Sequence, residues 1–336
     1  MSLTFGFVPR RLMGTGADFD IKRPWDDWMR DLTKLITTAE KAGFSFMGEG
    51  GRLSLMHYAS YASIPCNLRF VNETLTLPML DPMQLAIEGA HLDHILKGRL
   101  DFGVSIGYRP WELQAVGMTR KDRVGRLVES LKIIKLLWSE DSPSFHGKYW
   151  DFDELPLGEK PFQNPHPPII FSLHSHPAAA RAGRLGDGIC IGPTAGHEDS
   201  AAVADTFRKS YQETNGKLPT YIGARRDFFL GPDPNEAARQ AGQKEEYLQF
   251  GPGHNYVQGA MSEPTSLELH IQPVGDELPG NAFGGKYSHM LEQLSEFVEK
   301  SGCTHITCSF YNCQDTFEER LEYIQGFGEE VISKIK

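Results

Sequence analysis

Short apolar runs alternate with longer amphipathic stretches along most of the chain. The runs are bounded by glycine or proline and predict buried strands. The predicted strands are 3–8, 44–48, 68–77, 99–105, 168–173, 188–192, 221–230 and 304–310. Helical periodicity predicts helices at 25–42, 55–62, 82–96, 120–138, 177–185, 197–214, 235–248 and 317–335. Eight strands that are each followed by a helix indicate parallel βαβ units closed into a (β/α)8 TIM barrel.

One segment departs from this rhythm. Residues 250–285 lie between the seventh and eighth predicted strands, are rich in glycine and proline, and show little periodicity. Irregular segments of this length in a compact domain are usually functional lids or insertions, and both interpretations stay open. We therefore predict a single domain over residues 1–336 with an insertion between strands 7 and 8.

The composition excludes several kinds of partner. The chain has 44 acidic and 34 basic residues, a formal charge of −10, and no basic stripe, which argues against nucleic acid and anionic membranes. No apolar stretch approaches the ~18 residues of a membrane span. The N-terminus lacks a signal pattern, so we expect a cytoplasmic protein. Five cysteines without a CxxC motif predict reduced thiols, and their spacing predicts no metal site.

The barrel prediction places the active site at the carboxyl ends of the strands. The candidates there are Pro9, Arg10, Arg11, Glu49, Asn72, Glu73, Ser105, Gly107, Tyr108, Arg109, His174, Ser175 and His176. Strand-end position also suggests a partly apolar substrate pocket, lined by Phe7, Met47, Met56 and Tyr256.

The sequence HSHP at 174–177 is the best candidate for an anion site. Two imidazoles and a hydroxyl precede a predicted helix whose first turn carries Pro177 and three alanines, so free backbone N–H groups and the helix dipole favour a phosphate there. A simple helix cap by Ser175 is the competing interpretation. Zinc is disfavoured because no third ligand lies near the two histidines in sequence.

The sequence GVSIGYRP at 103–110 follows the fourth predicted strand and does not match the dinucleotide fingerprint. Gly107 instead suggests close approach of a flat ligand to the backbone. Tyr108 can stack on such a ligand, and Arg109 either pairs with an anion or forms a surface ion pair. No P-loop, G-x-S-x-G elbow or H-E-x-x-H motif supports ATP chemistry or hydrolysis.

Three stretches resemble the bacterial luciferase-like flavin-dependent monooxygenases, a superfamily that also contains F420-dependent oxidoreductases. They are LDHILKGRLDFGVSIGYRPWELQAVG at 92–117, SFHGKYWDF at 144–152 and PHPPIIFSLHSHPAAARAGRLGDG at 165–188. The resemblance implies a barrel, usually a homodimer, that holds a flavin at the carboxyl ends of its strands. It also implies a cofactor-contacting strand end at Ser105, Ile106, Gly107 and Tyr108, and a non-proline cis peptide at Asn72–Glu73.

The same resemblance supports phosphate binding at His174, Ser175 and His176. A phosphate-binding arginine that the luciferases carry at the Ile106 position is missing, and Arg109 is a candidate replacement. Many members have Glu-His-His where this chain has Glu49, Gly50 and Gly51. The first of those histidines is implicated as catalytic in the luciferases, so its absence argues against light-emitting aldehyde oxidation without excluding oxygenation.

The leading hypothesis is a two-component monooxygenase. A transiently bound flavin reductase would supply reduced FMN, and O2 would oxidise a small organic substrate through a C4a-(hydro)peroxyflavin. The predicted catalytic residues are Glu49, Asn72, Glu73 and Ser105, with Glu49 and Glu73 as acid/base groups whose pKa an apolar flavin face would raise. For Glu73, an ion pair with a neighbouring strand is the alternative.

Two further hypotheses remain open. An F420-dependent reductase or dehydrogenase would transfer hydride without oxygen and would need basic residues for the anionic tail of its cofactor. Arg10, Arg11, Arg52 and Arg109 are the few that this barrel mouth offers. The emptied pair Gly50 and Gly51 is also compatible with a non-catalytic flavin-binding paralogue.

Overall fold

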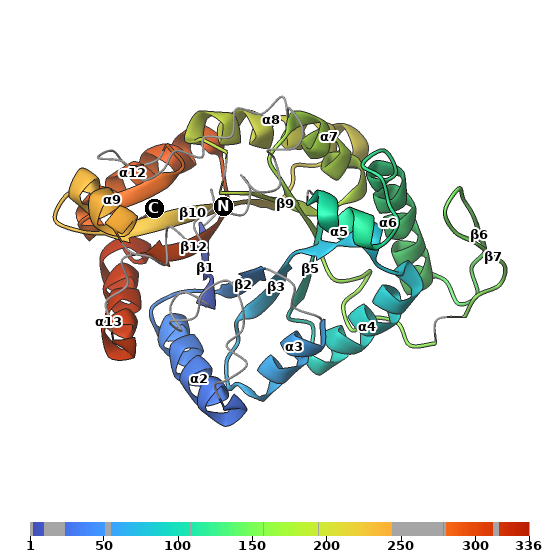
Figure 1. Ribbon diagram of the computed structural model, residues 1–336, viewed down its shortest axis with the longest axis horizontal. Helices are drawn as coiled ribbons and strands as arrows, with labels where there is room; N and C mark the ends of the chain where they lie inside the picture. The colour runs from blue at the N-terminus through green and yellow to red at the C-terminus, as the bar shows by residue number, and fades with distance from the viewer. Residues whose placement is uncertain are drawn as a thin grey trace.

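Parallel strands close into a barrel that helices surround on the outside (Figure 1). The computed structural model describes residues 3–9, 24–50, 55–107, 109–156, 158–193, 195–243, 278, 280–311 and 316–335. In order around the barrel, the strands are β1 (Thr4–Phe7), β2 (Phe46–Gly50), β3 (Arg69–Glu73), β5 (Leu100–Ser105), β8 (Ile169–Leu173), β9 (Gly188–Ile191), β10 (Tyr221–Leu230) and β12 (His305–Tyr311). The ring closes where Tyr221 pairs with Gly188 and Thr4 with His305. The predicted (β/α)8 TIM barrel is confirmed.

The helices form the outer layer of the barrel. They are α2 (Trp25–Lys41), α3 (Leu55–Ala59), α4 (Pro82–Ile95), α5 (Pro110–Ala115), α6 (Arg123–Ser139), α7 (His176–Leu185), α8 (His197–Asn215), α9 (Pro234–Gln243), α12 (Tyr287–Ser301) and α13 (Phe317–Phe327). Local sequence sets their ends. Asp81 caps α4 by accepting hydrogen bonds from the N–H groups of Met83 and Gln84, both at 2.9 Å. Gly216 and Gly302 end α8 and α12 in the left-handed conformation.

Several elements differ from the sequence prediction. Helix α12 falls where no helix was predicted, and α13 ends at Phe327 and continues as the π-helical turn η3 (Gly328–Ile332). The hairpin of β6 (Phe145–His146) and β7 (Asp151–Phe152) projects from the barrel (Figure 1). Strand β11 (Ala282–Gly285) pairs with the end of β10. Most of the predicted lid or insertion, residues 250–285, lies outside the described residues, so its role stays a prediction.

The third predicted strand is broken near the barrel mouth. Strand β3 ends at Glu73, and the short strand β4 (Leu75–Thr76) continues the pairing with β5, before the 3-10 turn η2 (Leu77–Met79). The peptide bond between Glu73 and Thr74 is cis. The non-proline cis peptide that the resemblance implied is therefore present, one bond later than expected.

The apolar core lies between the barrel and its helices. Phe7 points outward and packs edge-to-face on Phe44, with ring centroids 5.5 Å apart, and Met47 is buried in the same cluster. The prediction that Phe7 and Met47 line a substrate pocket is wrong, because alternate strand residues face opposite sides of the barrel wall. Met56 is 82% exposed on α3, and Tyr256 lies outside the described residues.

Polar and aromatic groups fill the amino-terminal floor of the barrel. The rings of Tyr221 and His305 stack with centroids 3.8 Å apart, and the Arg69 guanidinium pairs with the Asp101 carboxylate at 2.6 Å. Burial lowers the pKa of His305 to about 4, so its imidazole is neutral near pH 7. These groups occupy the floor, and the site chemistry lies above them, toward the carboxyl ends of the strands.

Candidate functional site

Glu73 reaches across the barrel lumen from β3 to the opposite wall. Its Oε1 accepts a hydrogen bond from the Thr307 hydroxyl at 3.0 Å and a longer one from the Cys190 thiol at 3.8 Å. Its Oε2 lies 3.6 Å from Nη1 of Arg225. These partners belong to β12, β9 and β10, which stand opposite β3 in the closed ring. The predicted ion-pair alternative for Glu73 thus joins opposite walls rather than neighbouring strands.

Gly48 makes room for this carboxylate. A methyl group built at Gly48 would lie 2.6 Å from Oε1 of Glu73 and 3.2 Å from the Thr307 methyl group. Both distances are shorter than ordinary van der Waals contact, so the Glu73 carboxylate occupies the volume that a larger residue on β2 would fill.

The net effect of its surroundings is to raise the pKa of Glu73. Burial raises the pKa of Glu73, whereas Arg225, Thr307 and Cys190 act in the opposite direction. Burial and the neighbouring carboxylate also hold the pKa of the Cys190 thiol well above its ordinary value, which keeps the thiol as a donor. A carboxyl group of this kind can hold or release a proton, and the acid/base role that the sequence predicts for Glu73 stays a prediction.

Sequence reasoning missed Arg225, Thr307 and Cys190. All three lie inside strands of the second half of the barrel rather than just beyond strand ends. The available signal was the adjacent pair Arg225 and Arg226, followed by Asp227, in a strand whose other residues are mostly apolar, because alternation sends one arginine side chain inward and the other outward. Arg226 is fully buried against the helices, with its guanidinium 4.8 Å from the Phe297 ring centroid.

Asn72 holds β3 to β5. Its side-chain N–H donates to the Gly103 carbonyl at 2.7 Å, and its side-chain oxygen accepts from the Gly103 N–H at 3.1 Å. A methyl group at Gly103 would lie 1.9 Å from the Asn72 carbonyl oxygen, so the two strands approach too closely for any other residue. The side chain predicted as catalytic and cofactor-binding is directed at the backbone of β5, and its predicted role stays untested.

Ser105 is the last residue of β5, and Gly107 lies two residues further along the chain. The half-buried Ser105 hydroxyl donates to the Leu75 carbonyl at 3.3 Å. Gly107 has φ of +74°, and a methyl group there would lie 2.4 Å from the Thr76 methyl group. Only glycine meets both demands, the positive φ and the close approach of the Thr76 side chain. Tyr108 lies outside the described residues.

Arg109 forms a half-buried ion pair, whereas the alternative that sequence reasoning left open was an ion pair on the surface. Its Nη1 lies 2.9 Å from a carboxylate oxygen of Glu112, one turn along the chain. The backbone of Glu49 lies in β2 and pairs with Asn72 of β3. The Glu49 side chain lies outside the described part of the chain, as do Arg10, Arg11, Gly51 and Arg52.

Residues 174–176 join β8 to α7, at the carboxyl edge of the barrel. Ser175 is the N-cap of α7 in extended conformation, yet its side chain makes no capping hydrogen bond. The simple-cap interpretation of Ser175 is therefore wrong. Burial lowers the pKa of His174, which keeps that imidazole neutral near pH 7. His176 turns toward α8, where its Nδ1 lies 2.7 Å from the Thr206 hydroxyl.

These residues fit a flat cofactor with a phosphate. Just after β9, a methyl group on Gly192 would meet, among the described residues, only the Leu173 carbonyl oxygen, at 3.8 Å, so the described part of this wall leaves space. The first turn of α7 lacks a side-chain cap, which suits an anion.

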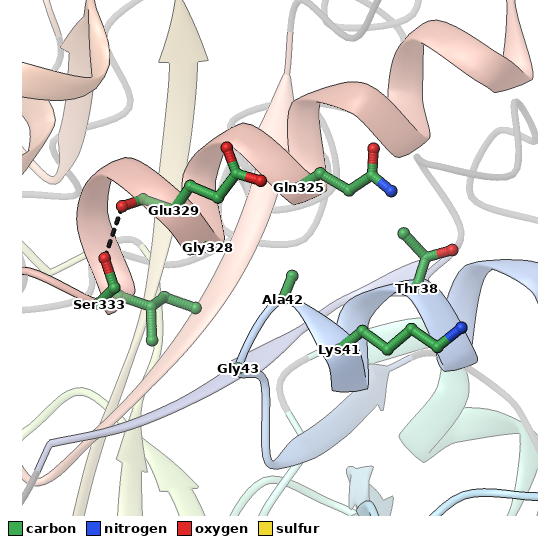
Figure 2. A pocket seen from close by; sticks show the side chains of 9 residues that line it. Thr38, Lys41, Ala42, Gly43, Gln325, Gly328, Glu329 and Ser333 are labelled. Carbon is green, nitrogen blue, oxygen red and sulfur yellow. Dashed lines mark hydrogen bonds between the residues drawn. The ribbon is translucent and has the colours of Figure 1, made fainter.

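A separate surface pocket of about 500 Å³ lies between α2 and the last helices (Figure 2). Lys41, Gly43, Gln325, Glu329 and Ser333 are among its lining residues. Because α2 ends just before β2 begins, this pocket is at the amino-terminal side of the barrel. It contains none of the predicted site residues.

The described residues contain no metal cluster, no disulfide and no membrane-spanning helix. No group of three or more His, Cys, Asp or Glu side chains there could hold a metal ion. Cys66, Cys190, Cys303 and Cys308 are free thiols, and Cys313 lies outside the described part. None of the described helices combines the length and apolar character that a membrane crossing requires.

Comparison with known structures shows the fold. The monooxygenase RslO1 from Streptomyces bottropensis superposes with a TM-score of 0.76 at 18% identity, covering 98% of this chain and 99% of that one. The FMN complex of the oxygenating constituent of 3,6-diketocamphane monooxygenase from Pseudomonas putida gives 0.74 at 19% identity, covering 100% and 99%.

Sequence relatives fall into two cofactor classes. An FMNH(2)-dependent dimethylsulfone monooxygenase from Pseudomonas putida is 28% identical over 64% of this chain and 61% of its own. An F420-dependent hydroxymycolic acid dehydrogenase from Mycobacterium tuberculosis is 31% identical over 56% of this chain and 49% of its own. The chain thus spans less than two thirds of these relatives. Pyrimidine monooxygenase RutA from Variovorax paradoxus is 22% identical over 90% and 86%.

A match that is longer than those of the first two sequence relatives identifies the family. The model of the luciferase-like monooxygenases matches residues 11–293, which is most of the chain and includes β2 to β11. The resemblance carried by residues 92–117, 144–152 and 165–188 is thereby confirmed. This chain belongs to the luciferase-like monooxygenase family.

Proposed function

We propose that the protein is the oxygenase component of a two-component, FMN-dependent monooxygenase that oxidises a small organic substrate with O2. The observation that carries the proposal is the first turn of α7, which follows a barrel strand and is left without a side-chain cap by Ser175. Such a terminus suits the phosphate of FMN. Relatives named as FMNH(2)-dependent and flavin-dependent monooxygenases support the same cofactor.

Each part of the site has a place in this proposal. Ser175 and the backbone of the first turn of α7 would hold the phosphate, and Ser105, Gly107 and Gly192 would border the ring system. Reduced FMN, when bound, supplies the electrons that activate dioxygen. Glu73 would hold or release a proton at its carboxylate, inside a lumen whose floor is filled by the Tyr221 and His305 rings.

F420-dependent hydride transfer is the second candidate function, because F420-dependent relatives match the chain as well. Its cofactor needs several cations for an anionic tail. Of the four arginines expected for that tail, Arg109 alone is described, and it is paired with Glu112 at 2.9 Å. A carboxylate therefore already engages this arginine.

The experiment is an anaerobic titration with reduced FMN and, separately, with reduced F420, followed by admission of oxygen. We expect saturable FMN binding and a flavin absorbance transient that outlives free reduced FMN in air. Tight F420 binding without FMN binding would establish the alternative. FMN binding without turnover across substrate candidates would indicate a non-catalytic paralogue.

The proposal extends to the assembly. We infer a cytoplasmic homodimer that meets its flavin reductase transiently. Light scattering coupled to size-exclusion chromatography tests the dimer, because a mass near 37.6 kDa, that of a single chain, contradicts it. Oxygenase activity with reductases from unrelated sources would support transfer of FMN through solution.

A further inference from the structure

Arg225 presents a loosely held positive charge to the lumen. Its Nε donates to the Ser309 hydroxyl at 2.9 Å, which fixes the inner edge of the guanidinium. Its Nη1 is 3.6 Å from Oε2 of Glu73, too far for a hydrogen bond. The guanidinium is thus anchored at one edge, while its ionic partner is within Coulomb range but makes no hydrogen bond to it.

The exposure of the pair is unequal. The Arg225 side chain is 24% exposed and the Glu73 side chain 6%. Both face the lumen, whose floor is occupied by the stacked Tyr221 and His305 rings. The guanidinium is therefore the more solvent-accessible of the two charged groups.

We propose that Arg225 binds an anionic group of the organic substrate, a carboxylate or a sulfonate, and that Glu73 then takes up one proton from solvent. The inference rests on the proposed function, since it names the substrate class of the same site. A planar guanidinium with one edge turned to the lumen is suited to bind two oxygens of such a group.

The charges around the pair explain the coupling. Glu73 is faced by Arg225 from β10, by the Thr307 hydroxyl from β12 and by the Cys190 thiol from β9. Arg225 is the only cation among these partners within the described residues. When an incoming anion engages that cation, Glu73 keeps two neutral donors in a buried setting, and its proton affinity rises.

The groups around Arg225 act in the same direction. Burial would lower the pKa of Arg225, but Glu73, Tyr311 and Asp227 together raise it, so the guanidinium stays charged. Binding therefore changes the protonation of Glu73 alone: one proton moves from water to a Glu73 oxygen, and no covalent bond of the protein breaks.

Calorimetric titration of the full chain tests this, with and without oxidised FMN. Benzoate and 1-propanesulfonate serve as anionic probes and benzamide as the neutral control. Tris and imidazole are suitable buffers, because their ionisation enthalpies differ and neither is an anion. We expect at least one anionic probe to bind, benzamide to bind at least tenfold more weakly, and up to one proton to be taken up per site. No anion binding up to about 10 mM, well above the ~1 mM of a weak ligand, would overturn the inference.

Substitutions test the roles of Arg225 and Glu73 separately. Arg225→Met should lose about tenfold or more in probe affinity, as expected for one charge-assisted hydrogen bond, whereas the surface variant Arg30→Met should not. Glu73→Gln should bind the probe at least as tightly but without proton uptake. If Arg225→Met does not fold, Arg225→Lys replaces it in the test. This variant keeps the charge and should retain the preference for anions.

Two results would contradict the inference specifically. Unchanged proton uptake in Glu73→Gln would assign the proton to another group, and equal binding of benzoate and benzamide would remove the anion preference. FMN binding is measured on the same samples. Failure to bind FMN sinks the proposed function, whereas FMN binding without anion binding sinks only the inference.

Discussion

Glu73 and Arg225 face each other from opposite walls of the barrel, with Oε2 and Nη1 separated by 3.6 Å and no hydrogen bond between them. A buried pair with this geometry gains little from direct bonding and leaves both groups available to other partners. We therefore expect the protonation of Glu73 to respond more than that of any other group at the site when the partners of this pair change.

Stability should therefore depend on pH through Glu73. Burial raises its pKa in the folded state, so the folded protein binds this proton more tightly than the unfolded chain does. The contribution to the free energy of unfolding is fully present below the unfolded pKa and is lost as pH rises through the folded pKa. Urea unfolding of wild type and Glu73→Gln should show wild type losing stability relative to the variant as the pH rises above about 4.5. A constant difference across this range would contradict the raised pKa.

Asn72→Ala should destabilise the barrel. It removes both side-chain hydrogen bonds to the Gly103 backbone, and an unpaired buried backbone group costs about 1–3 kcal/mol. Chemical denaturation measures the loss. The exposed Asn235 on α9 provides the matched control, because Asn235→Ala should change the free energy of unfolding by no more than about 0.5 kcal/mol. Equal effects of the two changes would remove the structural role of Asn72.

Ser175→Asp should weaken FMN binding through charge repulsion at the first turn of α7. Riboflavin lacks the phosphate, so its affinity should change less than that of FMN. We expect the ratio of FMN to riboflavin affinity to fall about tenfold or more. The exposed Ser142→Asp adds the same charge elsewhere and should leave the ratio unchanged. An unaltered ratio in Ser175→Asp would place the phosphate somewhere else.

Gly48 and Gly192 should respond differently to the same substitution. Gly48→Ala places a methyl group 2.6 Å from the Glu73 carboxylate, so that carboxylate must shift, and we expect about 1–3 kcal/mol of destabilisation. In the part of the chain that the structure describes, the methyl group of Gly192→Ala meets only a carbonyl oxygen at 3.8 Å, so this variant should fold with nearly wild-type stability, yet bind FMN more weakly. Thermal unfolding and fluorescence titration measure the two effects. Full FMN affinity in Gly192→Ala would mean that the ring system does not approach β9.

The strand and helix pattern predicted the barrel because buried parallel strands are short apolar runs that amphipathic helices separate. Helix α12 escaped because it follows directly on the glycine-rich segment that ends at Gly285. Strand β3 was predicted as one element through Leu77, whereas it breaks after Glu73 and Asn72 supplies hydrogen bonds to β5 at that point. These deviations depend on tertiary contacts that local periodicity does not report.

The site was predicted in part for a similar reason. Glu73 and Ser175 follow from strand-end position, but the partners of Glu73 come from the far wall and depend on the register of β10. Arg225 and Arg226 are the same residue type in adjacent positions, one in the lumen and one behind it. A shift of one residue in register would exchange them, and no pattern in this strand decides between the two.

Because side chains fill the floor of the barrel, its lumen opens at the carboxyl-terminal end of the strands. With the Tyr221 and His305 rings stacked at 3.8 Å beneath the site, a ligand that covers the mouth also covers the route by which water reaches Glu73. The number of protons bound to groups in the lumen is then set when the ligand enters. The order in which ligands arrive would determine whether the chemistry begins with an acid or with its conjugate base.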